Sequence, residues 1–528
     1  MKSVEIRNLT EDYEAARSLV EDFLNRSRVS EAIVYETMLI FEAVCYRIFE
    51  QEAGSSIVVT TEGHKRFHGA SINLNYEGSM FIAESGIPGE PTPEDRIFNA
   101  YADRIDYSYR SHFNSIRIQA RRSYVGASVA YIVAILLGFL VYAVLHSITG
   151  GQSDEALREK LFFPLETLFA NAMLMIGAPV TFLSLLKHLT DTYILAERDS
   201  GIRKITRQTM ASSIICVLLA VATCRVLNIA TSPFRRLLEG YGKLNIHMEL
   251  GSFIRGLMPS DIFTPFQTIS PFPLILLAAL VTYAFCSVGK YFDKMMDAID
   301  VCYALFARML TIIMVTLPVF TFCATMDVLL VNNTSDVLLF FSKFILLIFI
   351  SMIVPAIYYT LRLAARGISI REFFKRSRPF LRENFKIASV IDAVPYNIRY
   401  CMRHYGLDRK LLETNMPVLA EVNLDGNCYL LTLISLIFVT FSGPGTTIWE
   451  MLLIAMLVFV LSLGAPNQPG SCIIGILIIL HYVQAYTFIP FAIFAEVFFG
   501  AMLNLMNVTG DIITEVVNEK PKLLMKKQ

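Results

Sequence analysis

The chain has 528 residues, of which 54% are hydrophobic and 17% charged, and its formal net charge is +0. Soluble globular proteins carry about 25% charged residues, so the composition excludes an ordinary soluble protein. The absence of net charge argues against a nucleic-acid partner. Apolar residues are concentrated after residue 123. We therefore expect a soluble head, residues 1–120, followed by a membrane body, residues 121–528.

The nine cysteines form no Cys-x-x-Cys pair and have no His–Cys spacing of the kind that binds metal. We interpret them as small buried hydrophobic residues in a reducing cytosol or in lipid. Residues 1–25 are charged and have a helical pattern, so the sequence predicts no signal peptide.

The head has the pattern of one α+β domain. Residues 12–24 and 30–51 are predicted to form amphipathic helices. Alternating apolar and polar residues predict strands, with a Gly/Pro loop at 86–93. The expected strands are 55–61, 68–76, 79–84 and a last one that begins at 115–118.

Six segments of the body are apolar and long enough to cross a bilayer, which takes about 20 residues. Prolines interrupt the fourth segment at its start and the fifth near its middle. The six expected spans are 124–146, 165–186, 210–230, 271–288, 301–325 and 337–363.

The pattern changes after the sixth span. Residues 386–401 are too short and too polar to cross alone, and residues 415–441 form a span broken by Asn-Leu-Asp-Gly-Asn. In 449–482, residues 464–470 separate two arms of roughly 12 to 15 residues, each shorter than a bilayer is thick. Irregular backbone at membrane depth survives only where it lines a protein cavity. With a last span at 483–517, we expect eight spans plus two re-entrant helical hairpins.

Basic residues predict the topology. They gather before the first span, between the second and third, after the sixth and at the C-terminus. All of these regions are cytoplasmic if the head is cytoplasmic, and the loop 231–267 is a mild exception. We therefore expect a multi-pass protein of the cell inner (plasma) membrane with both termini inside.

Two polar stretches interrupt this apolar sequence. Asn507 and Asp511 are one helical turn apart and share a face of the last span. Asn423 and Asp425, beside Gly426, break the span before it. An ionised Asp in lipid is costly unless it is neutralised, and a cation bound partly by freed backbone carbonyls would neutralise it. The pattern indicates an ion-coupled transporter; the alternative is that these residues only hold helix breaks by hydrogen bonding.

The body resembles the dicarboxylate/amino acid:cation symporter family over residues 124–520. The resemblance rests on Pro417 followed by Asn423-Leu424-Asp425-Gly426, and on Asn507-Val508-Thr509-Gly510-Asp511. The order of six spans, hairpin, broken span, hairpin and last span is also the family order. It implies a homotrimer and an elevator-type motion of a transport core, residues 371–520, against a scaffold, residues 124–363. It also implies coupling to Na+ or protons.

Carried over to this chain, the resemblance implies two sodium sites. Asn507 would contribute its backbone carbonyl and Asp511 its carboxylate to the first. Asn423 and Asp425 would bind the second, and residues 212–213, both Ser, would complete it. Sodium is a hard cation that suits such oxygen ligands, as calcium and magnesium do.

The solute site departs from the family. Leu503 and Gly500 stand where members that take acidic solutes carry an Arg and an Asp. The core holds five acids, and like charges brought together at low dielectric repel by several kcal/mol. We therefore expect a neutral or cationic amino acid whose amine meets Glu496 or Asp392. Alternatively, Glu496 is protonated or hydrogen-bonded between helices, and Asp392 faces solvent. The expected solute-binding residues are Ser389, Asp392, Asn427, Pro469, Gly470, Glu496 and Asn504.

The head resembles the ATP-binding domain of anti-sigma serine kinases, of the histidine-kinase-type ATPase superfamily. Glu42, Glu84 and Gly86 would be its degenerate nucleotide-binding residues. Tyr46 replaces the magnesium-binding Asn of that family, and the Gly-rich phosphate lid is missing. The resemblance implies a regulatory domain with weak or no nucleotide binding and no catalysis; the alternative is a domain that only docks or stabilises.

These observations favour a sodium-coupled (or proton-coupled) secondary symporter of a small organic solute, which is not an enzyme. The alternative is a sensor whose transporter-like body binds solute and signals through the head. ATP-driven pumping is disfavoured because the chain has no Gly-x-x-x-x-Gly-Lys-Ser/Thr loop. The expected partners are the lipid bilayer, the solute and two further copies of the chain.

Overall fold

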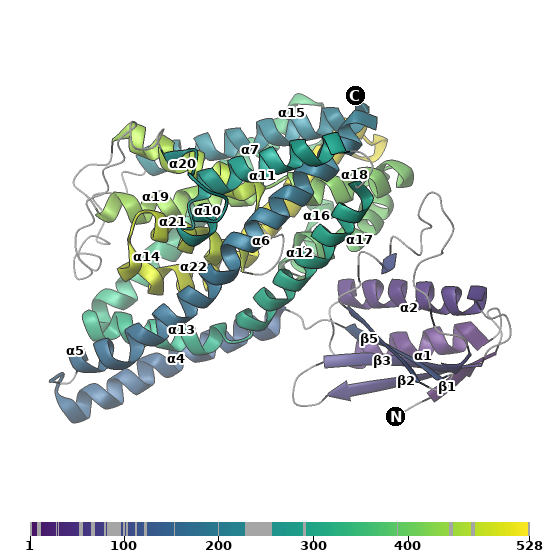
Figure 1. The fold of residues 1–528 in the computed structure, drawn as a ribbon, viewed down its shortest axis with the longest axis horizontal. Helices are drawn as coiled ribbons and strands as arrows, with labels where there is room; N and C mark the ends of the chain where they lie inside the picture. Colours follow the sequence, from purple (N-terminus) through teal and green to yellow (C-terminus); the bar gives the residue numbers. More distant parts are fainter. Residues whose placement is uncertain are drawn as a thin grey trace. The chain divides into compact units, whose positions relative to one another are not determined.

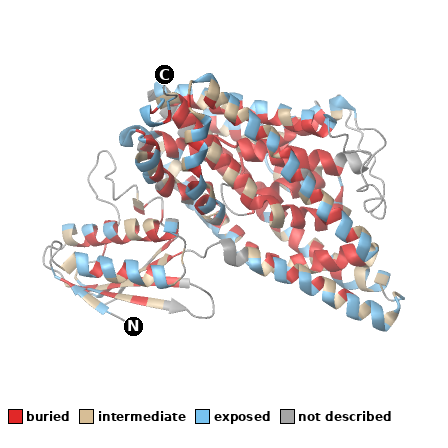
Figure 2. Cartoon of the chain, turned by 180° about the vertical axis from the view of Figure 1, so that it is seen from behind, coloured by how far each residue is buried: buried red, intermediate tan, exposed pale blue. Residues whose placement is uncertain are grey.

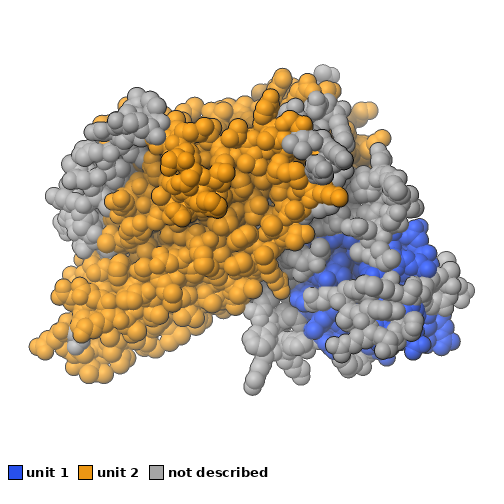
Figure 3. All heavy atoms as spheres, viewed as in Figure 1, with its two compact units in different colours: residues 1–126 blue, residues 127–528 orange. Residues whose placement is uncertain are grey.

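The chain divides into two compact units, Met1–Gly126 and Ala127–Gln528 (Figure 3). We describe each unit by itself, from a computed structural model. The residues that the structure describes are 3–7, 12–27, 29, 31–51, 56–64, 69–78, 81, 97–98, 101, 104–110, 113–120, 124–152, 154–198, 200–226, 256–288, 292–387, 389–442, 447–465 and 470–525.

The head is an antiparallel sheet with two helices on one side (Figure 1). The strand order is β1-β2-β3-β5-β4. The elements are β1 (Ser3–Ile6), α1 (Asp12–Arg26), α2 (Glu31–Gln51), β2 (Ile57–His64), β3 (Gly69–Glu77), β4 (Ile105–Arg110) and β5 (Phe113–Ala120).

The two helices and three of the strands lie where the sequence predicts them. The helical pattern assigned to the first 25 residues is wrong at β1, a four-residue edge strand too short to show a period. The strand β4 was not predicted. The expected strand at 79–84 and the loop at 86–93 lie outside the described residues, apart from Phe81.

Strand alternation builds the core of the head. In β5, Asn114, Ile116, Ile118 and Ala120 are buried, and the residues between them are not. The apolar faces of α1 and α2 pack on this side of the sheet. Arg104, just before β4, is also buried, and its guanidinium lies 2.8 Å from the carboxylate of Glu36 on α2.

The first part of the body contains the helices that include the expected spans. They are α4 (Tyr124–Thr149), α5 (Asp154–Leu157), the π-helical turn η2 (Arg158–Phe162), α6 (Phe163–Arg198), α7 (Ser200–Val226), α10 (Thr264–Gln267), α11 (Pro271–Val288), α12 (Phe292–Met314), α13 (Leu317–Val331), α14 (Thr334–Ser351) and α15 (Ile353–Ala365).

The rest of the body has shorter and more broken helices. They are α16 (Ile370–Ile387), α17 (Val390–Tyr400), η4 (Cys401–Tyr405), α18 (Arg409–Val422), η5 (Asn427–Leu431), α19 (Thr432–Ser442), α20 (Ile448–Leu463), α21 (Ser471–Tyr482), η6 (Tyr486–Phe488), α22 (Ile489–Glu519) and η7 (Lys522–Leu524).

Among the described residues, five helical runs are long and apolar enough to cross a membrane, or six if a bent pair counts as one. That pair is α12 and α13, whose axes differ by 52° within the expected fifth span. The proline at 318 lies in the first turn of α13, where it is compatible with a helix start. Apolar side chains on α4 are exposed, as expected for contact with lipid, whereas buried residues fill the middle of the body (Figure 2).

The expected breaks after the sixth span are present. α20 and α21 end and begin on either side of residues 464–470, and α18 ends at Val422 before the chain resumes as η5. The helix α16 was not predicted, because its many basic residues were interpreted as a cytoplasmic loop. The number of membrane crossings stays a prediction. The re-entrant path of the two hairpins, expected at 386–401 and 449–482, also stays a prediction.

The last helix lies at the centre of the body. Most of α22 is buried, and it packs against α13, α15, α16, α17, α18 and α21. α7 packs against α18, α19, α20 and η5. α7 and nearly all of α15 lie in the range expected to be scaffold, residues 124–363, and yet both contact elements of the expected core.

Candidate functional site

The side chain of Asn507 links α22 to the broken span. At the break, the backbone amide of Gly426 donates to Asn507 Oδ1 over 2.7 Å, and that of Asn427 donates to the same oxygen over 3.4 Å. In return, Asn507 Nδ2 donates to Asn427 Oδ1 over 2.9 Å. Gly426 and Asn427 belong to one of the two polar stretches of the sequence, and Asn507 belongs to the other. These hydrogen bonds therefore show that the two stretches meet.

Glycines make this approach possible. A Cβ at Gly426 would lie 2.2 Å from the backbone oxygen of Leu503, and one at Gly510 would lie 2.6 Å from Asn423 Nδ2. Both distances are far shorter than van der Waals contact. The glycine in each motif therefore serves close packing of α22 against the break.

Asp425 is buried and surrounded by hydroxyl donors. Its carboxylate accepts hydrogen bonds from Ser212 (2.7 Å), Ser213 (3.2 Å) and Tyr359 (3.0 Å). Arg362 on α15 donates to the Ser212 oxygen over 3.2 Å. The positive charge of a guanidinium thus lies one hydroxyl group away from Asp425.

Asp511 has a different environment. Its Oδ1 accepts from Asn423 Nδ2 over 2.8 Å, and the same amide donates to the backbone oxygen of Asn507 over 3.2 Å. Asn423 Oδ1 is buried and has no hydrogen-bond partner among the described residues. A buried amide oxygen without a donor is costly, and it is the kind of ligand that a hard cation binds. We call Ser212, Ser213, Tyr359, Arg362, Asn423, Asp425, Asn427, Asn507 and Asp511 the central cluster.

Glu496 belongs to a separate contact. It is buried on α22, and its two oxygens accept from the backbone amides of Gly470 and Ile473 over 3.0 Å each. These amides lie at the start of α21, where a negative charge is favourable. A Cβ at Gly500 would lie 2.7 Å from Glu496 Oε1, so the Glu496 side chain fills the space next to Gly500. In this structure Glu496 is therefore a hydrogen-bonded acid between two helices.

The other predicted solute-binding residues are more scattered. Ser389 is buried just before α17, and Asn504 is buried on α22, three residues before Asn507. Asp392 lies on α17, but its side chain is outside the described residues, as is all of Pro469. These residues do not define a solute site by themselves.

Of the three predicted nucleotide-binding residues, Glu84 and Gly86 lie outside the described residues. Glu42 is exposed on α2. Burial, followed by the nearby charge of Glu42, raises the pKa of the Tyr13 hydroxyl above its ordinary value. Glu42 therefore lies on the side of α2 that approaches α1.

The sequence did not reveal the contribution of α15. Tyr359 and Arg362 both reach the central cluster, and Arg362 also donates to Thr514 on α22 over 3.1 Å. A signal was present, since Arg362 is an ionisable residue inside the expected span 337–363. Such residues within spans mark functional sites by default.

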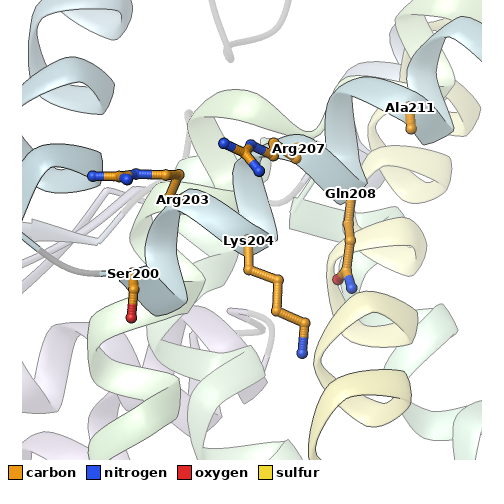
Figure 4. A pocket seen from close by; sticks show the side chains of 6 residues that line it. All are labelled: Ser200, Arg203, Lys204, Arg207, Gln208 and Ala211. Atoms are coloured by element: carbon orange, nitrogen blue, oxygen red, sulfur yellow. The ribbon is translucent and has the colours of Figure 1, made fainter.

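A hollow of about 480 Å³ lies beside the first turns of α7 and contains none of the central cluster. Arg203 and Arg207 extend from one side of α7 and Lys204 from another (Figure 4). Gln208 is tied to Asn518 of α22 over 2.8 Å. The lining residues are Ser200, Arg203, Lys204, Arg207, Gln208 and Ala211. This end of α7 is therefore basic, as the predicted cytoplasmic side requires.

Comparison with known proteins identifies the family of the body and gives no match for the head. A family model described as the sodium:dicarboxylate symporter family matches residues 127–520. The match includes every residue of the central cluster. It begins after the head, so the resemblance of the head to ATPase domains gains no support from it. The search of curated proteins finds no match.

Proposed function

We propose a function from one premise: this chain belongs to the sodium:dicarboxylate symporter family. The family is one of membrane transporters. We infer that the body is a sodium-coupled symporter of a small organic solute, with a proton as the alternative coupling ion. The observation that carries this proposal is the buried, unpartnered Oδ1 of Asn423, the residue whose Nδ2 donates to the carboxylate of Asp511.

The first sodium ion would be held by Asp511, Asn423 Oδ1 and the backbone oxygen of Asn507. These are carboxylate, amide and carbonyl oxygens, the donor set that hard cations prefer. The side of Asp425 fits a second ion less well, because three hydroxyl groups already donate to its carboxylate and Arg362 is close. We therefore place the main coupling ion at Asp511.

The solute is proposed to be a neutral or cationic amino acid. Leu503 and Gly500, on the face of α22 that meets the break, supply no cation for an acidic side chain. Asp425, Asp511 and Glu496 are all buried nearby on α22 or at the break. These acids would repel the carboxylate of an acidic side chain on the solute. Arg362 is the cation of the central cluster that could offset this repulsion. Aspartate is accordingly expected to be a poor substrate.

The ion proposal is tested on the purified full chain by thermal unfolding in NaCl or choline chloride at equal ionic strength. A ligand that binds the folded state raises its apparent stability. We expect sodium to stabilise the wild type and D408N, whose exposed side chain caps α18, but not D511N. An equal sodium effect in D511N would place the ion elsewhere.

Transport is tested by counterflow in proteoliposomes, with labelled neutral, cationic and acidic amino acids in turn. Sodium-dependent exchange of a neutral or cationic amino acid is expected. Rapid uptake of aspartate at low concentration contradicts the solute proposal, whereas binding without any exchange favours the sensor.

The assembly and motion are proposed from the family premise. We propose a homotrimer in the inner membrane, with both termini cytoplasmic and an elevator motion of the core. The core would include α7 and α15 as well as residues 371–520, since both helices contribute to the central cluster. Mass measurement in nanodiscs tests the trimer, and accessibility of a cysteine placed at the head tests the topology.

The head is proposed to regulate transport, with docking as the second role. Deleting residues 1–115 should change the transport rate or its sensitivity to ATP. Unchanged transport, together with no ATP binding in calorimetry, would leave only docking.

A further inference from the structure

A second group of buried charges lies away from the central cluster, where α6 and α13 pack together next to η2. Arg158 on η2 donates through Nε to Asp327 Oδ1 over 2.8 Å. Asp327 is fully buried, whereas the Arg158 side chain is 22% exposed. π-Helical turns such as η2 are rare and occur frequently at functional sites.

Glu166 on α6 is the unmatched member of this group. It is fully buried, and neither carboxylate oxygen has a hydrogen-bond partner among the described residues. It interacts electrostatically with both Asp327 and Arg158. The other titratable side chain of α13 that interacts with it is Cys323.

Aromatic contacts close the site on both sides. Phe162, four residues before Glu166, packs edge-on against Phe322, and Phe169, three residues after it, stacks on Phe320. These spacings put Glu166 on the face of α6 that meets α13, between two aromatic pairs. The phenylalanines of these two pairs have no polar atoms, so they cannot donate a hydrogen bond to the carboxylate.

The charges of the group do not balance. Of the described charges that act on one another here, Glu166 and Asp327 bring two negative charges, and Arg158 brings one positive charge. An uncompensated buried charge is strongly destabilising, so one further positive charge is required. The described residues contain no cluster of three or more His, Cys, Asp or Glu side chains that could hold a metal ion. A proton needs only one carboxylate oxygen.

We propose that Glu166 and Asp327 hold one proton between them, next to Arg158, and that this contact between α6 and α13 is a proton-binding site. It is separate from the central cluster and does not depend on the function proposed for that cluster. Because the folded state binds this proton and the unfolded chain releases it at neutral pH, raising the pH must destabilise the folded state.

The test is thermal unfolding of the purified full chain between pH 5.5 and 9, at constant sodium. Glu166→Gln keeps the shape of a protonated acid, and Glu155→Gln removes an exposed acid of α5 as a matched control. Between the pKa of an unfolded carboxyl group, about 4, and the midpoint of the site, each pH unit should lower the folded-to-unfolded ratio about tenfold more in the wild type and E155Q than in E166Q. Parallel profiles of wild type and E166Q would overturn the proposal.

Two further measurements keep the proposal testable if E166Q does not fold. Asp327→Asn leaves Glu166 balanced by Arg158, so its profile should also lose the pH dependence. Infrared difference spectra of wild type minus D327N should contain the C=O stretch of a protonated carboxylic acid. Absence of this band would contradict the proposal. So would restoration of wild-type stability at pH 9 by added NaCl or KCl, since a metal ion would then occupy the site.

Discussion

In the head, the buried guanidinium of Arg104 lies 2.8 Å from the buried carboxylate of Glu36, one cation for one acid. In the body, the central cluster has Asp425 and Asp511 with Arg362 as its cation. The contact between α6 and α13 repeats that ratio with Glu166, Asp327 and Arg158. The other buried cation of the described head, Arg47, lies 3.1 Å from the partly exposed Glu50, so each buried charge there has a partner of opposite sign. Both sites of the body have one acid more than they have cations.

This difference distinguishes buried ion pairs that only stabilise the fold from buried acids that require a bound cation or proton. A matched buried pair is complete, so it only holds elements together, as Arg104 holds the start of β4 to α2. A site with an excess acid must take up a cation or a proton, because a lone buried charge is too costly. We therefore propose that a bound cation or proton balances the excess in the body, whereas the head shows no such excess in its described residues.

The largest expected effect comes from breaking the matched pair. Arg104→Met leaves Glu36 buried without its cation, and breaking such a pair costs about 3–5 kcal/mol. Limited proteolysis of the full chain should therefore cut the head at a much lower temperature than in the wild type. The control is Arg117→Met, whose partner Glu62 is 3.7 Å away and partly exposed, so it should differ little from the wild type. Equal protection of the two variants would show that Arg104 does not stabilise the head.

An intermediate effect is expected at Arg362. Arg362→Gln removes the cation of the central cluster and its hydrogen bonds to Ser212 and Thr514. Hydrogen bonds to charged groups contribute about 1.5–3 kcal/mol, so the sodium-free protein should lose about 2 kcal/mol. With both acids then unbalanced, sodium should stabilise the variant more than the wild type. The measurement is thermal unfolding with and without NaCl.

Arg366→Gln is the matched control for this variant, because Arg366 is exposed just after the end of the same helix. It should behave as the wild type in both salts. If R362Q responds to sodium no more than R366Q does, Arg362 contributes nothing to the charge balance of the cluster.

Local sequence was enough to identify the two polar motifs. Spacing alone put Asn507 and Asp511 on one helix face and marked a break at Asn423 and Asp425, and the structure shows that the two stretches meet. Ser212 and Ser213, which the family resemblance assigned to the site of Asp425, donate to its carboxylate in the structure. What these side chains bind was not tested by the fold and stays a proposal.

Contacts between helices that are distant in the sequence were not predictable in this way. Tyr359 and Arg362 act on Asp425 only because α15 packs against α7 and α22. Glu166 interacts electrostatically with Asp327 only because α6 packs against α13. No spacing in one helix encodes such a pair. The partners of Glu496, two backbone amides at the start of α21, were not predictable for the same reason.

The smallest expected effect concerns Glu496, an acid that needs no cation, because the start of α21 supplies two amide donors. Glu496→Gln removes the charge and leaves one oxygen acceptor, and a charge near a helix N-terminus contributes about 1 kcal/mol. Thermal unfolding should therefore show a small loss that is independent of sodium, larger than in E159Q, whose side chain is exposed. A loss that depends on sodium or on an amino acid solute would instead make Glu496 part of a binding site with an excess acid. In that case it would belong with Asp511 and Glu166 rather than with the matched pair of the head.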